Sequence, residues 1–355
     1  MNKAEYTLEV PTDRFELYRL ILEKAVEGPV KVMVAGGVDS GKTTLVNFLL
    51  NGLIGEGLKV AVVDSDVGQK SILPPATVSM GFPEGPVRSL SDVYGMYHYF
   101  IGTTSPGQYM GEMVVAVSRL TEMASRMADV TLVDTTGFVS GPGSDLKRLK
   151  VEAVRPDFLV LLERGNELET LARSVGGHTR VIRLGVSERA RRYSPEERRS
   201  LRNDKWKTYF RDSRVLEVDL RKIIPTGTAM FQGRELDGRE KTLLSRLFDW
   251  IIFAGWEFEK YVVVKADAGD PRFPRRGLHA IDFEGLSNLL VGFINEAGLC
   301  EALGILKWIR FSDMKAEVLT PLPEDRLSEM TELRFGRIRV LESGEELGLL
   351  RREEL

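Results

Sequence analysis

Residues 36–44 read Gly-Gly-Val-Asp-Ser-Gly-Lys-Thr-Thr, which fits the spacing G-x-x-x-x-G-K-T. A short apolar run, Val32 to Ala35, precedes this stretch, and an apolar helical pattern, Leu45 to Leu50, follows it. A glycine-rich turn between any strand and helix can match the spacing by chance. Here, however, the strand, the glycines, the Lys-Thr pair and the helix come in the required order, which predicts a phosphate-binding loop (P-loop).

The residues of this loop have distinct expected tasks. The glycines let the backbone curl so that successive N–H groups and the helix N-terminus point at a triphosphate. We expect Lys42 to reach the β- and γ-phosphates and the Thr43 hydroxyl to bind Mg²⁺, with ATP or another nucleoside triphosphate as ligand. The predicted nucleotide-binding residues are Gly36, Gly37, Val38, Asp39, Ser40, Gly41, Lys42, Thr43 and Thr44.

Length and composition predict a cytoplasmic enzyme. The 355 residues suffice for about two domains. No apolar run approaches the ~18 residues of a membrane span, and the first residues lack the apolar stretch of a signal peptide, so no membrane association is expected. The single cysteine, Cys300, excludes an intramolecular disulfide, and the three scattered histidines give no zinc-ligand spacing.

Positive charge is concentrated in one segment. The net charge is only -3, but residues 180–222 contain 14 Lys or Arg against 7 Asp or Glu. Such a patch can hold a polyanion that the whole molecule would not attract. A solvated helix face in a charge-rich chain explains the same composition equally well.

Short apolar runs alternate with helical patterns through the first half of the chain. This alternation predicts an α/β fold with a mostly parallel sheet covered by helices on both faces. Ligands of such sheets bind at the carboxyl ends of the strands. The further strands are expected at 59–64, 97–101, 129–134, 158–162 and 180–184, and the clearest helix at 108–127.

Carboxylates follow two of these strands. Asp64 and Asp66 leave the strand that ends near residue 64, and Asp134 ends the strand at 129–134. At the edge that also carries the P-loop, such groups can hold Mg²⁺ or accept a proton from an attacking hydroxyl. How the three residues divide the metal and proton work stays open, although Asp134 has the position of a magnesium-organising carboxylate.

The basic segment contains a predicted helix. Ser194-Pro195-Glu196-Glu197 is a capping box with proline at the first helical position, so a helix begins here and extends to about residue 211. Arg198, Arg202 and Lys205 share one face of it. Arginines on a lid helix can stabilise charge on a transferring phosphoryl group. The same helix could instead bind a nucleic-acid backbone, with its aromatic residues as a stacking surface.

These motifs together resemble the polynucleotide 5′-hydroxyl-kinase family, and most of all its archaeal members. The family includes the RNA kinase of the eukaryotic pre-mRNA cleavage and tRNA-splicing complexes and the ribosomal-RNA-processing kinases. Five pieces match in the family's order: GGVDSGKTT at 36–44, DSDVGQ at 64–69, GTTSPG at 102–107, TTGFVSGPGSDLKRLKVEAVRPD at 135–157 and RRSLRNDKWKTYF at 198–210.

The resemblance implies roles for individual residues. Asp64 or Asp66 would deprotonate the 5′-hydroxyl group, and Thr43, Asp66 and Asp134 would bind the metal. The implied lid arginines are Arg198, Arg199 and Arg202, and the residues implied near the acceptor or in a clasp over the P-loop are Gln69, Thr103, Thr104, Thr135, Gly137 and Phe138. Phe138 stands where the family usually has tryptophan. The eukaryotic relatives carry a domain ahead of the kinase core, whereas only about 30 residues precede this P-loop, so protein partners are left open.

The sequence thus predicts an ATP-dependent kinase that phosphorylates 5′-hydroxyl ends of RNA, with DNA as a further acceptor, in RNA processing, tRNA splicing or repair. A partner-regulated P-loop nucleoside triphosphatase and a non-catalytic RNA-binding scaffold that retains nucleotide are the alternatives. Nothing that the P-loop mechanism needs is missing, which counts against the scaffold.

The expected domains are a kinase domain at 1–222, with a lid at about 186–212, and a smaller mixed α/β domain at 223–355. The second domain is expected to contain a helix at 243–253 and strands at 261–264 and 337–341. Its tryptophans, Trp250, Trp256 and Trp308, are most simply core or interface residues. An RNA-binding face is the alternative.

Overall fold

The computed structural model describes residues 12–188, 190–266, 277–351 and 354–355. Its contacts divide the chain into two compact units. The first comprises residues up to Ile101 together with Ser105–Ser200, and the second comprises Gly102–Thr104 and Leu201–Leu355. The division at residue 200 falls inside helix α6 (Pro195–Tyr209). The domain boundary that the sequence predicts between residues 222 and 223 stays a prediction.

The first unit is built on one seven-stranded sheet. Its strand order is β4-β3-β2-β5-β1-β6-β7, and all neighbours from β2 to β7 are parallel. The strands are β1 (Val30–Gly36), β2 (Val60–Ser65), β3 (Thr77–Gly81), β4 (Gly95–Phe100), β5 (Val130–Thr135), β6 (Phe158–Glu163) and β7 (Arg180–Gly185). The α/β fold with a mostly parallel sheet is therefore confirmed. Strand β3, which the sequence analysis missed, pairs antiparallel with both β2 and β4.

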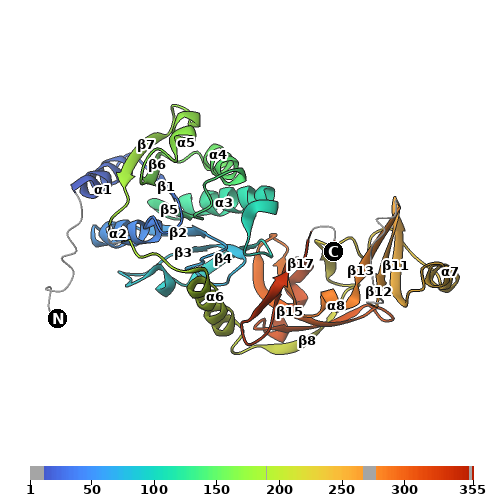
Figure 1. Cartoon of the computed structure of the whole chain (residues 1–355). Helices are drawn as coiled ribbons and strands as arrows, with labels where there is room; N and C mark the ends of the chain where they lie inside the picture. The colour runs from blue at the N-terminus through green and yellow to red at the C-terminus, as the bar shows by residue number, and fades with distance from the viewer. Residues whose placement is uncertain (1–11, 189, 267–276, 352–353) are drawn as a thin grey trace. The chain divides into compact units, whose positions relative to one another are not determined.

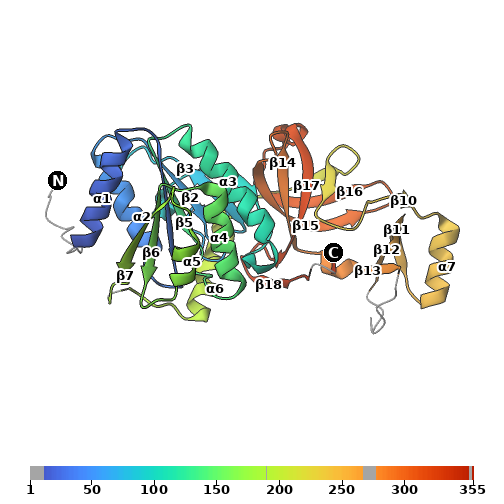
Figure 2. The ribbon, with the colours of Figure 1, turned by 90° about the horizontal axis from the view of Figure 1, so that it is seen from above.

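Helices cover both faces of this sheet (Figures 1 and 2). They are α1 (Thr12–Ala25), α2 (Lys42–Gly55), α3 (Met110–Ser125), α4 (Pro142–Val154) and α5 (Glu169–Ser174), with short 3-10 turns η1 (Leu90–Asp92) and η2 (Pro106–Gln108). Leu17 and Ile21 of α1 pack with Leu45 and Leu49 of α2 onto one face, whereas α3 and α4 lie on the other. The central strands β1, β2, β5 and β6 are buried on both faces, which is why they read as continuous apolar runs.

The second unit is richer in strands than the predicted mixed α/β domain. It has a four-stranded sheet, β10-β11-β12-β13, and a seven-stranded sheet that runs β18-β17-β14-β15-β16-β8, with β9 paired to β17. Its elements are β8 (Arg214–Asp219), β9 (Ile224–Thr226), β10 (Arg234–Glu235), α7 (Gly238–Phe248), β11 (Ile252–Phe258), β12 (Lys260–Lys265), β13 (Leu278–Asp282), α8 (Phe283–Leu286), β14 (Leu289–Asn295), β15 (Cys300–Arg310), β16 (Lys315–Thr320), η3 (Glu324–Glu329), β17 (Met330–Val340) and β18 (Glu346–Leu349).

The C-terminal end predicted for the helix at 243–253 is wrong. Helix α7 stops at Phe248 because Asp249 adopts a left-handed backbone with φ 55°, and β11 starts at Ile252. The strands expected at 261–264 and 337–341 fall within β12 and at the end of β17. Trp256 is buried in the core as expected, but Trp308 is half exposed.

No helix among the described residues is long and apolar enough to cross a membrane.

Candidate active site

The P-loop joins the end of β1 to the start of α2, as predicted. A Cβ atom on Gly36 would lie 2.5 Å from Ser40 Oγ and 2.7 Å from the carbonyl oxygen of Leu162, so only glycine fits here. The residue before α2 is Gly41, and no side chain caps this helix. The first N–H groups of α2 are thus open to an anion.

Lys42 lies folded over its own loop. Its Nζ donates a hydrogen bond to the carbonyl oxygen of Gly37 at 2.7 Å, and only 6% of the residue is exposed. Burial lowers the pKa of the Lys42 ammonium, while the nearby carboxylates of Asp134 and Asp66 act in the opposite direction. The cation is therefore held within the loop before any phosphate arrives.

Thr43 and Asp134 are directly bonded. The Thr43 hydroxyl donates to Asp134 Oδ2 at 2.7 Å. Asp134 is 1% exposed, and its other oxygen, Oδ1, is buried without a hydrogen-bond partner among the described residues. Burial, with the neighbouring Asp64 carboxylate as a second cause, raises the pKa of this carboxyl to about 7. A buried carboxylate oxygen without a donor is an environment that a cation would satisfy.

Asp64 has no such vacancy. Its Oδ2 accepts the backbone N–H groups of Ser71 (2.7 Å) and Ile72 (2.8 Å), and its Oδ1 accepts that of Asp66 (3.0 Å). The buried Lys70 ammonium lies 3.5 Å from Oδ2 and also donates to the Asp64 carbonyl oxygen. The side chain thus holds the loop after β2 in place.

Asp66 lies in that loop and is only half buried. Its Oδ1 accepts the backbone N–H groups of Gly68 (2.9 Å) and Gln69 (2.8 Å). The second oxygen, Oδ2, accepts no hydrogen bond from the described residues. Asp66 is thus an oriented carboxylate with one oxygen available, and it is close enough to Lys42 to affect its charge.

Two further buried lysines were missed by the sequence analysis. Lys147 of α4 donates to the carbonyl oxygen of Thr136 at 2.6 Å, and Lys150 donates to Ser65 Oγ at 3.2 Å. Burial lowers the pKa of both ammonium groups, that of Lys150 to about 7. The signal was their position on α4: they fall on the same face as the apolar residues that contact the sheet.

The predicted clasp touches the P-loop. A Cβ atom on Gly137 would lie 2.9 Å from the backbone nitrogen of Val38, so this glycine permits close approach of two backbones. The Thr135 hydroxyl, however, is buried and donates to the carbonyl oxygen of Val34 at 2.8 Å. Phe138 is partly exposed beside them.

The segment after β7 also reaches the P-loop, at Asp39. Asp39 Oδ2 accepts Arg198 Nη2 at 2.5 Å and the backbone N–H of Tyr193 at 3.1 Å. The Asp39 carbonyl oxygen accepts Arg164 Nη2 at 2.9 Å. Arg198 therefore contacts the P-loop, and its role as a lid arginine stays a prediction. Arg199 is exposed, and Arg189 of the predicted lid lies outside the described residues.

Arg202, the third predicted lid arginine, has a different environment. Its Nε and Nη2 donate to both carboxylate oxygens of Glu346, each at 3.0 Å in the better pairing. Trp206 is fully buried, and its Nε1 donates to the same carboxylate at 3.1 Å. Trp206 therefore offers no surface for base stacking, contrary to that alternative. These contacts lie within the second unit.

Thr103 and Thr104 also belong to the second unit. Thr103 is buried and Thr104 partly exposed. The carbonyl oxygen of the preceding Gly102 accepts the backbone N–H of Arg337 at 2.7 Å. These contacts fix the start of the 102–107 turn.

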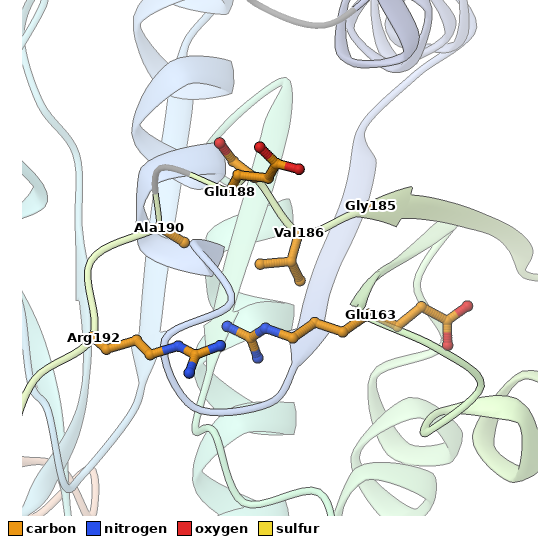
Figure 3. A pocket seen from close by; sticks show the side chains of 8 residues that line it. Glu163, Gly185, Val186, Glu188, Ala190 and Arg192 are labelled. Carbon is orange, nitrogen blue, oxygen red and sulfur yellow. The ribbon is translucent and has the colours of Figure 1, made fainter.

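A pocket of about 320 Å³ lies where β6 and β7 end (Figure 3). It is lined by Glu163, Arg164, Gly185, Val186, Ser187, Glu188, Ala190 and Arg192. In Figure 3 the Arg192 guanidinium points into the centre, below Val186, whereas the Glu163 carboxylate points away from it. Glu163 pairs with Arg183 at 2.8 Å. Since Arg164 also contacts Asp39, the pocket adjoins the P-loop.

No group of three or more His, Cys, Asp or Glu in the described ranges is arranged to hold a metal ion. The metal candidates are instead a hydroxyl and carboxylates at the P-loop, Thr43, Asp134 and Asp66.

Comparison with known proteins identifies close relatives of the whole chain. The polyribonucleotide 5′-hydroxyl-kinase of Thermococcus kodakarensis is 52% identical over 358 residues, which cover 100% of both chains. That of Methanocaldococcus jannaschii is 45% identical over 100% of this chain and 99% of its own. The Xenopus tropicalis polyribonucleotide 5′-hydroxyl-kinase Clp1 is 30% identical over 55% of this chain and 47% of its own.

The family model for the mRNA cleavage and polyadenylation factor CLP1 P-loop matches residues 36–212. Among solved structures, the wild-type Clp1p–Pcf11p complex superposes with a TM-score of 0.60 over 92% of this chain and 78% of that chain, at 12% identity. At this identity the likeness concerns the fold alone.

Proposed function

The chain belongs to the polyribonucleotide 5′-hydroxyl-kinase family, and from that premise we propose that it transfers the γ-phosphoryl group of ATP to the 5′-hydroxyl end of RNA. The observation that carries the proposal is the Asp66 carboxylate: two backbone N–H groups orient it, and one of its oxygens stays available. An oriented carboxylate beside a P-loop suits proton abstraction from an attacking hydroxyl.

The P-loop binds the donor in this proposal. The open N–H groups of the first turn of α2 receive the phosphate oxygens. Lys42 exchanges its bond to the Gly37 carbonyl oxygen for the β- and γ-phosphates, and its positive charge stabilises the negative charge that develops on the leaving ADP. The positive charge does not have to be brought in from solvent, because the side chain is already buried in the loop.

Asp66 acts on the acceptor. As the 5′-oxygen forms its bond to the γ-phosphorus and the bond to the β-γ bridging oxygen breaks, the hydroxyl proton passes to Asp66 Oδ2. The products are a 5′-phosphate and ADP. Asp64 is unsuited to this task, because its oxygens already accept three backbone N–H groups and face Lys70. Gln69 and Phe138 are the proposed contacts of the terminal nucleotide in the first unit, while Thr135 and Gly137 support the backbone at the P-loop. The roles of Thr103 and Thr104 in acceptor binding stay predictions.

The residues at the P-loop fit a magnesium ion. Asp134 Oδ1 is a buried carboxylate oxygen that accepts no hydrogen bond from the described residues. The Thr43 hydroxyl donates a hydrogen bond to the other oxygen, Oδ2, of the same carboxylate. Oxygen donors of this kind are what Mg²⁺ binds, and it usually keeps several waters. We propose that Thr43 and Asp134 hold Mg²⁺, with Asp66 bound through a water. The ion would neutralise charge on the β- and γ-phosphates.

The pocket at the ends of β6 and β7 is the proposed site of the donor's nucleobase. Val186 offers an apolar contact, and a guanidinium such as that of Arg192 can lie against the face of an aromatic base. The pocket adjoins the P-loop through the bond between Arg164 and Asp39, so a nucleotide can reach both places.

Labelled phosphate transfer tests the proposal. The protein is incubated with γ-labelled ATP, Mg²⁺ and 5′-hydroxyl RNA or DNA, with 5′-phosphorylated RNA and the Lys42→Ala variant as controls. We expect label only on 5′-hydroxyl ends and only with the unsubstituted protein. Hydrolysis of ATP that ignores the ends of the RNA would overturn the proposal and favour a regulated nucleoside triphosphatase.

A further inference from the structure

Asp39 is an unusual residue for its place. A loop that cradles a triphosphate gains nothing from a negative charge of its own, because like charges repel at short range. Asp39 also adopts a left-handed backbone with φ 54°, a conformation that most residues other than glycine avoid. Aspartate and asparagine tolerate this conformation better than most residues, so the backbone accounts for either side chain at this position but not for the negative charge.

The contacts of Asp39 come from the segments after β6 and β7. Its Oδ2 accepts both Arg198 Nη2 (2.5 Å) and the backbone N–H of Tyr193 (3.1 Å), and its carbonyl oxygen accepts Arg164 Nη2 (2.9 Å). The Asp39 and Arg198 side chains are 15% and 25% exposed, so water screens the pair only partly. One loop residue thus binds the start of the lid helix and the segment leading to it.

The bond leaves much of the arginine unused. A guanidinium has five N–H donors in a rigid plane, and Asp39 engages the Nη2 end of this one. Nη1 and Nε make no hydrogen bond to the described residues. When one end is fixed to the P-loop, the rest of the plane stays beside the loop, where a triphosphate would be bound.

We propose that Asp39 is the positioning residue for Arg198: its carboxylate anchors the guanidinium at the P-loop so that the remaining N–H groups meet the transferring phosphoryl group. The inference rests on the proposed kinase function. The same bond neutralises Asp39, which removes the repulsion that its charge would exert on the donor. Asp39 itself touches neither substrate in this arrangement.

The variants separate positioning from loop shape. Asp39→Asn keeps an oxygen acceptor for Tyr193 and a residue that tolerates the left-handed backbone, but it removes the charge that holds Arg198. Asp204→Asn makes the same chemical change at an exposed position of α6 and is the matched control. Arg198→Ala and the double variant Asp39→Asn/Arg198→Ala complete a double-mutant cycle.

We expect Asp39→Asn to lower kcat by about tenfold to a hundredfold with the KM for ATP changed less than about threefold, since misplacement of a catalytic group costs rate rather than ground-state binding. In the Arg198→Ala background, Asp39→Asn should add little further loss, because no guanidinium is left to position. Additive losses in the cycle, or a raised KM with unchanged kcat, would instead assign Asp39 to the shape of the loop and overturn the inference.

Amide hydrogen exchange gives a readout that does not depend on activity. In the free protein, Asp39→Ala should increase exchange at Tyr193 and in the first turn of α6, whereas Asp204→Asn should not. Unchanged exchange would refute the anchor. If the exchange data show the contact of Asp39 with Arg198 and Tyr193 but no RNA is phosphorylated, the proposed function fails while the contact itself is upheld. Failure of the kinase function can therefore be told apart from failure of the positioning role.

Discussion

Asp64 of β2 and Asp134 of β5 are register partners on neighbouring parallel strands, yet their carboxylates have opposite surroundings. Asp64 is saturated by three backbone N–H groups and accompanied by a lysine, whereas Asp134 keeps one buried oxygen without a donor. Two identical side chains at one edge of the sheet therefore have different tasks. The first holds a loop, and the second is suited to hold a cation.

Asp64→Asn should destabilise the protein without a specific effect on chemistry. The amide cannot accept all the N–H groups of Asp66, Ser71 and Ile72 with equal strength, and it removes the negative charge that lies 3.5 Å from the buried Lys70 ammonium. We expect the free energy of unfolding to fall by about 3 kcal/mol. Urea unfolding measures it. A variant as stable as the parent would show that the loop does not depend on this carboxylate.

Asp66→Asn should have the reverse effect. The amide oxygen can still accept the N–H groups of Gly68 and Gln69 on a half-buried residue, so we expect the free energy of unfolding to change by less than about 1 kcal/mol. The group can no longer accept a proton, and kcat should fall by about 10² to 10⁴ with ATP affinity retained. Single-turnover transfer and nucleotide titration measure these quantities. If Asp64→Asn rather than Asp66→Asn abolishes transfer at unchanged stability, the two assignments are reversed.

The different tasks of Asp64 and Asp66 could not be predicted from the sequence. Local spacing places both residues after a strand, and it correctly predicted the P-loop, the parallel strands and the helix that begins at Pro195. Asp64, and not Asp66, has both carboxylate oxygens occupied by hydrogen bonds, because the chain turns back and the N–H groups of residues 71 and 72 donate to Asp64. That return is a tertiary event, and no periodicity in the sequence encodes it.

The buried lysines and the second unit were missed for a related reason. From the sequence alone, Lys147 and Lys150 are expected to face solvent, because lysine is rarely buried. In the structure the Thr136 carbonyl oxygen and the Ser65 hydroxyl at the edge of the sheet accept hydrogen bonds from them. In the second unit, β8 pairs with β16 across about a hundred residues. Short strands that pair with strands far away in the chain carry a weak local signal in the sequence. The sequence therefore predicted fewer strands in the second unit than the structure contains.

His98 makes the stability of the first unit depend on pH. Burial, with the nearby Lys70 ammonium as a second cause, lowers the pKa of this imidazole to about 3. The unfolded chain binds a proton below about pH 6.5, whereas the folded chain does not, so stability from this residue is complete above that pH and is lost as the pH falls toward 3.

His98→Asn should remove much of this loss while an amide keeps the hydrogen bond to Ser79. Between about pH 7 and about pH 4.5 we expect the parent to lose roughly 1 to 2 kcal/mol more than the variant, measured by urea unfolding. Substitution of the exposed His178 by asparagine is the control and should leave the pH dependence unchanged. Parallel curves for parent and His98→Asn would contradict the buried neutral imidazole.

Arg198 and Arg202 stand one turn apart on α6, and the structure predicts that they fail differently when removed. Arg202 forms a two-pronged bond with Glu346, which also accepts Trp206 Nε1. Arg202→Ala removes two N–H donors and their positive charge from this largely buried carboxylate, so we expect the free energy of unfolding to fall by about 2 kcal/mol while kcat changes less than about threefold. Arg202→Lys should recover only part of the stability, because an ammonium cannot form the two-pronged bond.

Arg198→Ala, by contrast, should leave the free energy of unfolding within about 1 kcal/mol, since its partner Asp39 keeps the hydrogen bond from the Tyr193 N–H and is not fully buried. Its cost should appear in kcat, by about 10³-fold or more, the usual effect of losing an arginine that contacts the transferring phosphoryl group. Steady-state kinetics and unfolding on the same two variants decide the matter. A loss of kcat in Arg202→Ala equal to that in Arg198→Ala, at unchanged stability, would return Arg202 to the catalytic set and make Glu346 its resting partner before the substrates bind.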